Sequence, residues 1–153
     1  MTLVTDRADF DDPRLAAFLQ EHLDDLRPTA PPESQHALDL EGLRRPSVRM
    51  WVVEDAEGVV ATGALAVVAA GHEEVKSMRT HPRARGRGVA RGLLAHLLDD
   101  ARARGVQRVS LETGSQDFFA PARALYAGAG FEVCGPFGSY TDDPNSTYMT
   151  RVV

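Results

Sequence analysis

Residues 73–105 constrain the fold and the function of this chain more than any other stretch. Apolar and polar residues alternate up to Thr80, which predicts a β-strand. Pro82 ends that strand because proline cannot donate a hydrogen bond to a neighbouring strand. A turn rich in glycine and arginine follows at 83–88, and residues 89–101 then carry apolar side chains at helical spacing. Because a helix N-terminus offers free N–H groups and partial positive charge, the stretch predicts an anion site, most simply for a phosphate.

The overall charge narrows the kind of anion. The chain has 153 residues and a formal net charge of −5, which argues against general nucleic-acid binding. Five arginines nevertheless fall between Arg79 and Arg91, so local positive charge on an acidic protein indicates a compact anionic ligand. The single cysteine, Cys134, excludes an internal disulfide and predicts no metal site. With no apolar run of membrane-spanning length and a polar N-terminus, we expect one domain, 1–153, in the cytoplasm.

Local patterns along the chain predict a mixed α/β architecture. Helices are expected at 13–26, 32–43, 89–104 and 121–127, and strands at 3–4, 48–54, 59–68, 73–80, 108–112, 131–134 and 147–152. Short turns between the three strands from 48 to 80 predict an antiparallel meander. The strands at 73–80 and 108–112 should be parallel, since a helix connects them by a right-handed crossover. Gly63 interrupts its strand and indicates a bulge or a close backbone approach.

The arginine turn departs from the two commonest nucleotide-binding motifs. It lacks the Lys-Ser/Thr pair of a P-loop, and Gly86-x-Gly88 is followed by Arg91 where a dinucleotide fingerprint has glycine. What remains, Arg85-x-x-Gly88-x-Ala90, resembles the pyrophosphate-binding motif of the GCN5-related N-acetyltransferases, the GNAT family. Glycines let the backbone approach phosphate oxygens, which explains the motif physically.

Three further features resemble the same family in order and spacing. They are the His-Pro turn after the first parallel strand, Leu111-Glu112 in the second, and the Leu-Tyr…Gly-Phe signature at 125–131. The resemblance covers the whole chain and is most specific over 74–131. The segments 31–38 and 143–146 are similar to those of a small bacterial single-domain branch sometimes labelled indole-acetate acetyltransferase.

The resemblance implies an α/β (α+β) GNAT fold. Its central sheet would be mixed and mostly antiparallel, with six to seven strands, about four flanking helices and a parallel pair that splays apart at the cofactor. It implies one N-acetyltransferase domain that uses acetyl-CoA and no metal, and that acetylates the amine of a small molecule or peptide in a ternary complex. Neither a nucleic acid nor a membrane is expected as a partner. The protein should be a monomer or a homodimer, because an exposed final strand could pair with a second copy.

The resemblance also carries roles to individual residues. The residues implied to bind the cofactor are Met78, Arg79, Thr80, Arg85, Gly86, Arg87, Gly88, Val89, Ala90, Arg123 and Tyr126. The backbone N–H near Met78 or Arg79 would polarise the thioester carbonyl. Many members carry asparagine seven residues before the tyrosine, where this chain has Phe119. That contact is lost or is supplied elsewhere, with Ser115 and Arg123 as candidates.

Tyr126 matches the family tyrosine that protonates the leaving thiolate, with simple packing as the alternative. A general base is needed because the amine arrives protonated, and Glu74 and Glu112 are the candidates at the ends of the parallel strands. The acceptor pocket should lie between the N-terminal helices and the C-terminal loop. The candidate lining residues are Glu33, His36, Tyr140, Asp142 and Asn145, with ordinary turn or cap roles as the alternative.

Two questions stay open from the residues alone. Acidic side chains near the expected pocket suit a small cationic amine such as an amino acid or a polyamine, whereas Arg44 or Arg45 could instead select a carboxylate. The alternative to an enzyme is a non-catalytic acyl-CoA sensor or structural protein that keeps the fold, and turnover with a panel of amines distinguishes the two.

Overall fold

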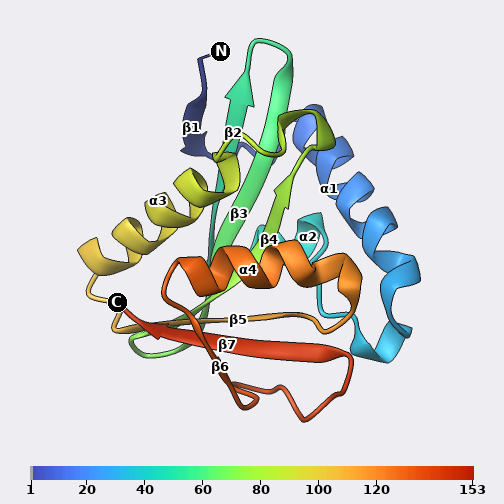
Figure 1. The fold of residues 1–153 in the computed structure, drawn as a ribbon. Coiled ribbons are helices and arrows are strands. Elements are labelled where there is room, and N and C mark those ends of the chain that lie inside the picture. Colours follow the sequence, from blue (N-terminus) through green and yellow to red (C-terminus); the bar gives the residue numbers. More distant parts are fainter. Residues whose placement is uncertain (1) are drawn as a thin grey trace.

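A seven-stranded sheet with helices on both faces forms the core of the computed structural model, which describes residues 2–153 (Figure 1). The strands are β1 (Val4–Arg7), β2 (Val48–Asp55), β3 (Gly58–Ala69), β4 (His72–Thr80), β5 (Arg108–Gly114), β6 (Glu132–Cys134) and β7 (Ser146–Val152). The α-helices are α1 (Pro13–Leu26), α2 (Leu40–Leu43), α3 (Val89–Ala103) and α4 (Ala120–Gly128). Short 3₁₀ turns are η1 (Arg27–Thr29), η2 (Pro32–Ser34), η3 (Pro82–Ala84) and η4 (Asp117–Phe119). Among these residues, no helix combines the length and the apolar character needed to cross a membrane.

The strand order is β1-β2-β3-β4-β5-β7-β6, and only β4 and β5 are parallel. This confirms the mixed, mostly antiparallel sheet and the crossover through α3. The final strand, β7, is paired on both sides, with β5 and β6. The prediction that the last strand is an exposed edge was therefore wrong, because β6 folds back outside it. The edges of the sheet are β1 and β6.

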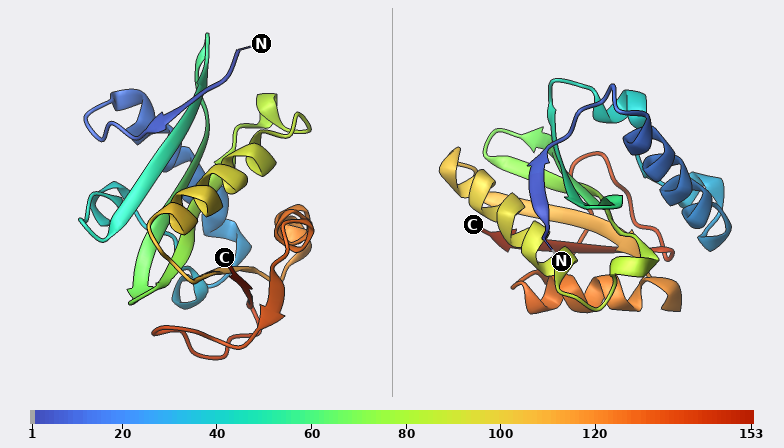
Figure 2. Two further views of the ribbon diagram at one scale, coloured as in Figure 1. Left: turned by 90° about the vertical axis from the view of Figure 1, so that its left-hand side faces the viewer. Right: turned by 90° about the horizontal axis from the view of Figure 1, so that it is seen from above.

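Each face of the sheet has its own apolar cluster. The helices α3 and α4 pack on one face, and α1 and α2 on the other (Figure 2). The buried residues of α3 are those of the predicted helical stripe: Val89, Leu93, Leu94, Leu97, Leu98 and Ala101. A second cluster contains Leu15, Phe18 and Leu19 of α1 together with Leu43 of α2. The sheet is thus the middle layer, with one apolar cluster and one pair of helices on each of its faces.

The predicted helix at 32–43 is broken into two short pieces. Residues 35–39 separate η2 from the four-residue helix α2. The side-chain amide of Gln35 donates hydrogen bonds to the carbonyl oxygens of Arg27 and Ala30, which holds this residue in an extended conformation. Asp39 then caps α2 by accepting from the N–H of Gly42. These side-chain bonds to the backbone compete with a continuous helix.

Irregular pairing in the middle of the sheet opens it. The β3–β4 register shifts between Thr62 and Ala64, opposite Ser77, which has a φ of 53°. Of the two alternatives predicted for Gly63, the register shift supports the bulge. The close neighbours of Gly63 are side chains, and an added Cβ atom would lie 2.6 Å from the Met78 sulfur. The parallel pairing of β4 with β5 extends only from His72 to Glu74. Beyond Glu74 the two strands separate, as the splayed pair requires.

Candidate active site

Three neighbouring hollows follow the gap between β4 and β5. The α3 cleft, of about 670 Å³, lies between the end of β4, the arginine turn, the start of α3, and α4. The central cavity, of about 140 Å³, lies in the gap itself. The aromatic pocket, of about 710 Å³, lies beyond it, against the loop from Phe137 to Asp143. The α3 cleft shares Met78 and Tyr126 with the central cavity, which in turn shares His36 and Lys76 with the aromatic pocket.

Nine of the eleven predicted cofactor-binding residues line the α3 cleft: Met78, Arg79, Thr80, Arg85, Gly86, Gly88, Val89, Ala90 and Tyr126. In the turn itself, Gly86 and Gly88 both have a φ of 76°, in the left-handed region that favours glycine. No atom of residues 2–153 lies within 4 Å of a Cβ built on either residue, which leaves room for a ligand against this part of the backbone. Gly88 is the N-cap of α3, and no side chain of the described residues forms a capping hydrogen bond at that helix end. The local chemistry is that of an anion site.

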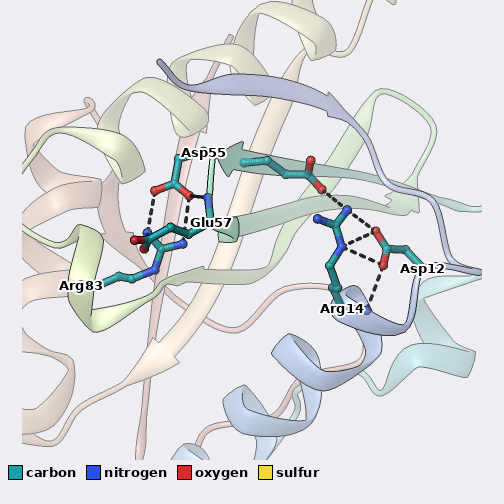
Figure 3. Close-up of polar contacts among 6 residues, drawn as sticks. Asp12, Arg14, Asp55, Glu57 and Arg83 are labelled. Carbon is teal, nitrogen blue, oxygen red and sulfur yellow. Dashed lines mark hydrogen bonds and ion pairs between the residues drawn. The ribbon is translucent and has the colours of Figure 1, made fainter. Parts of the chain in front are cut away.

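Two of the five clustered arginines are committed to structural ion pairs. Arg79, whose side chain is 7% exposed, pairs with Glu21 and Asp25 and so holds α1 against the sheet. Arg83 donates to both oxygens of Asp55, at 2.5 and 3.0 Å, which joins the β2–β3 hairpin to η3 (Figure 3). The hydrogen bond from Arg83 lowers the pKa of Asp55 to about 2. A separate pair at the start of α1, Asp12 with Arg14, appears in the same view.

The remaining basic residues divide between the cleft and its surroundings. Arg85 and Arg91 are exposed and line the α3 cleft, where they add positive charge to the turn. Arg87 is exposed in the same turn but is not part of the cleft wall. Arg123 lies outside the cleft, and its Nη1 donates to the carbonyl oxygens of Gly114 and Gln116. The contacts predicted for Arg87 and Arg123 therefore stay predictions.

Phe119 itself lines both the α3 cleft and the central cavity. Ser115, which was considered as a substitute for the family asparagine, donates its hydroxyl to the carbonyl of Pro144 and lines none of the three hollows. Where the family has a polar amide, this chain therefore presents an aromatic ring to the cleft.

Tyr126 lies in the wall between the α3 cleft and the central cavity. The residue is 6% exposed, and its ring packs edge-on against Phe131 with centroids 5.8 Å apart. Burial raises the pKa of the Tyr126 phenol, which is therefore neutral at physiological pH. Within residues 2–153, no hydrogen bond engages its hydroxyl. The phenol therefore keeps its proton and has it free for a ligand.

The two candidate bases occupy different surroundings. Glu112 lines the central cavity together with Tyr126, and burial raises the pKa of its carboxyl. Glu74 lines the aromatic pocket, where its Oε2 accepts a 2.5 Å hydrogen bond from the Tyr140 hydroxyl and lies 3.3 Å from Lys76 Nζ. Glu74 is thus already engaged, whereas Glu112 lines the same cavity as the Tyr126 phenol. A raised pKa also suits Glu112 to proton transfer near neutral pH.

The predicted acceptor residues border this same region. His36 and Tyr140 line the aromatic pocket and meet edge-on, with ring centroids 4.9 Å apart. Asn145 lines the central cavity, where its Oδ1 accepts from the side chain of Gln116. Burial raises the pKa of Tyr140, and the neighbouring Glu74 adds to this effect.

Two lining residues were missed by the sequence reasoning. Lys76 donates to the carbonyl of His36 at 3.0 Å and to the hydroxyl of Tyr140 at 2.8 Å. Strand alternation, which puts Lys76 on the same face as Glu74, could have found it. His22, in α1, lines both the central cavity and the α3 cleft, and burial lowers its pKa to about 4.

The two arginines considered as carboxylate-selecting residues lie away from the hollows. Arg44 bonds instead to the carbonyl of Phe10 and pairs with Asp11, and neither it nor Arg45 lines any of the three hollows. In the described part of the chain, His, Cys, Asp and Glu do not gather in a group of three or more that could hold a metal ion.

Comparisons with known proteins agree with this geometry. The model of the acetyltransferase (GNAT) family matches residues 15–131. The chain is 43% identical to the N-acetyltransferase YsnE of Bacillus subtilis, over 90% of this chain and 91% of that protein. It is 42% identical to an IAA acetyltransferase of Azospirillum brasilense, over 90% and 88% of the two chains. A GNAT acetyltransferase of Staphylococcus aureus has the same fold, with a TM-score of 0.79, 16% identity and 99% of each chain covered.

The matched residues include the arginine turn, β4, β5 and α4, so the family match and the site fall on the same elements. The protein is therefore an acyltransferase by class. More particularly, the chain belongs to the GNAT family of N-acetyltransferases, which confirms the resemblance seen in its sequence.

Proposed function

We propose that the protein transfers the acetyl group of acetyl-CoA to the amine of a small molecule or peptide, by direct attack within a ternary complex. The observation that carries the proposal is the shared wall at Tyr126 and Met78, which faces both the α3 cleft and the central cavity. A donor in the cleft and an acceptor in the cavity would meet at one buried phenol. A related fold is known with bound coenzyme A: PaiA N-acetyltransferase of Thermoplasma acidophilum, with a TM-score of 0.76, 13% identity and all of both chains covered.

The residues of the α3 cleft fit the donor. The open backbone at 85–90 would hold the pyrophosphate, with Arg85 and Arg91 supplying charge. Beyond Glu74, β4 stays paired with β3, but its edge toward β5 is unpaired and could offer hydrogen bonds to the amide groups of the pantetheine arm, as to an added strand. When bound, acetyl-CoA supplies the acetyl group as a thioester. The backbone N–H near Met78 or Arg79 would stabilise negative charge on its carbonyl oxygen.

We assign the proton transfers to Glu112 and Tyr126, which both line the central cavity. The acceptor nitrogen attacks the carbonyl carbon and gives up its proton to Glu112, directly or through water. The carbon–sulfur bond breaks, and the thiolate takes the proton of the Tyr126 hydroxyl. Glu74 is the second choice as base because Tyr140 and Lys76 already engage it.

Calorimetry and turnover test the proposal together. Acetyl-CoA should bind the wild-type chain, and Arg85→Ala combined with Gly88→Glu should weaken binding at least about a hundredfold, because a charge is lost and a carboxylate is placed at the pyrophosphate. Arg102→Ala is the matched control, since Arg102 lies in the last turn of α3, outside the cleft, and pairs with Asp99. Equal loss in the control, or none in the double variant, would sink the donor assignment. Binding without CoA release from any amine would favour the non-catalytic sensor.

A further inference from the structure

We propose that the acceptor is an amine that carries a second positive charge, of the class of linear diamines and polyamines. The reacting amine would lie in the central cavity and the second charge in the aromatic pocket. The inference rests on the proposed acetyl transfer and adds the class of acceptor to it.

The charge of the aromatic pocket is the first observation. Its walls carry the carboxyl groups of Glu33, Glu74, Asp142 and Asp143 against a single lysine, Lys76. The 3.3 Å ion pair of Lys76 with Glu74 offsets those two charges. The other three carboxyl groups form no ion pair within the part of the chain that the structure describes. A cavity of about 710 Å³ is thus left with an excess of negative charge.

One of these carboxyl groups is held in its charged form. Hydrogen bonds from the side chain of Ser34 and from the backbone N–H of Asn145 lower the pKa of Asp143. The 2.8 Å hydrogen bond from the Asn145 N–H also fixes the position of Asp143 at the side of the pocket that adjoins the central cavity, which Asn145 lines. An acceptor with a carboxylate would meet this charge and would find Lys76 already bonded to His36, Tyr140 and Glu74.

The second observation is independent of charge and lies in the central cavity. Ser77 lines this cavity and is 8% exposed, yet its Oγ has no hydrogen-bond partner in residues 2–153. The Oε1 atom of Gln116, from another wall of the same cavity, is likewise buried without a partner. Buried polar atoms without partners are costly and rare. With the Glu112 carboxyl they offer three oxygen-bearing groups to one space, which suits the N–H groups of a primary amine.

The connection between the hollows suits a narrow, flexible linker. The central cavity, at about 140 Å³, admits the end of an alkylamine rather than a bulky ring. Its shared wall at His36 and Lys76 leads to the rings of Phe137 and Tyr140, which offer apolar contact to methylene groups and cation–π attraction to a second ammonium. A chain of methylenes with an ammonium at each end matches both hollows at once.

Matched acceptors of one length test the inference. The probes are 1,5-diaminopentane, pentylamine and 5-aminopentanoate, with the corresponding butyl compounds as a second length, each assayed for CoA release from acetyl-CoA. We expect kcat/KM for the diamine to exceed that for pentylamine at least about tenfold, and that for the amino acid by more. The advantage should shrink as salt is raised, because the charges are partly exposed.

Variants assign the preference to the pocket. Glu33→Gln with Asp142→Asn should lower kcat/KM for the diamine about five- to tenfold and leave pentylamine unchanged, since both residues are exposed members of the pocket wall. Glu132→Gln, which removes an exposed carboxylate of β6 outside all three hollows, should change neither. Equal kcat/KM for diamine and monoamine overturns the inference but leaves acetyl transfer intact. Failure of all the amines to release CoA overturns the proposed function, and the inference with it.

Discussion

Replacing Tyr126 by phenylalanine removes one oxygen atom from the wall between the α3 cleft and the central cavity. The ring would keep its edge-on contact with Phe131, whose centroid lies 5.8 Å away. Because burial raises the pKa of Tyr126, the lost group is a neutral phenol and no charge is removed from the protein. The substitution therefore separates proton donation from packing, which are the two roles open to this residue.

The expected magnitudes follow from those surroundings. No protein group bonds to the Tyr126 hydroxyl among residues 2–153, so the free energy of unfolding should change by less than about 0.5 kcal/mol. A positioned general acid contributes roughly 10²- to 10⁴-fold to a rate, or about 2.7–5.4 kcal/mol of activation free energy. We expect kcat to fall at least about a hundredfold, with the affinity for acetyl-CoA nearly unchanged.

Three measurements on one variant check this reasoning: steady-state CoA release, calorimetry with acetyl-CoA, and urea unfolding. Tyr148→Phe is the matched control, because the hydroxyl of Tyr148 donates to the carbonyl of Thr141 at 2.7 Å and lines none of the three hollows. The control should lose about 1 kcal/mol of stability and keep its kcat. If Tyr126→Phe retains kcat within about threefold, the phenol is a packing residue and the assignment is refuted.

Further predictions concern pH and packing. Burial raises the pKa of Glu112, so the acidic limb of kcat/KM should lie above the range of an ordinary glutamate, and Glu112→Gln should abolish that limb. Because the folded state disfavours the charged Glu112 carboxylate, the free energy of unfolding should fall as pH rises from the unfolded-state pKa of Glu112 to its folded-state pKa. Glu112→Gln should regain this stability, as measured by urea unfolding at neutral pH. His22 has its pKa lowered to about 4 by burial, so the wild-type chain should lose on the order of 2–3 kcal/mol between about pH 6.5 and pH 4. His22→Gln should remove that loss, and parallel stability–pH curves would contradict it. Gly63→Ala places a Cβ 2.6 Å from the Met78 sulfur and should cost about 1–3 kcal/mol in chemical denaturation and weaken acetyl-CoA binding, whereas an unchanged midpoint would show that Met78 moves aside freely.

The arginine turn and its flanking elements show which structural features could be predicted from local sequence. The alternation of β4, the glycines of the turn and the stripe of α3 lie within 73–105, and each is set by neighbours along the chain. Their geometry could be predicted because strand and helix periodicities and the left-handed preference of glycine are local properties. The number of arginines available to an anion could not be predicted in this way, because it depends on ion pairs with residues distant in the sequence. Arg79 and Arg83 pair with Asp25 and Asp55, which lie 54 and 28 residues away.

The prediction of one helix at 32–43 was wrong for a related reason. Its apolar spacing is helical, yet Gln35 bonds to carbonyl groups of η1 and Asp39 caps a later turn. Side-chain contacts of this kind outweigh a weak propensity over so short a stretch. The prediction that the final strand is an exposed edge was wrong because the pairing of β7 with β6 depends on where the chain returns after α4.

The order of residues along the chain was sufficient to predict the residues of the α3 cleft, where we propose that the donor binds, since the strand, the turn and the helix start that form it are contiguous. The acceptor side was decided only by tertiary structure. Glu112 and Glu74 look equivalent in sequence, but the separation of β4 from β5 leaves one facing the central cavity and the other bonded to Tyr140. Lys76 meets His36 and Tyr140 only after three distant segments have packed together. Burial, charge pairing and cavity shape arise from such long-range contacts, and no local pattern encodes them.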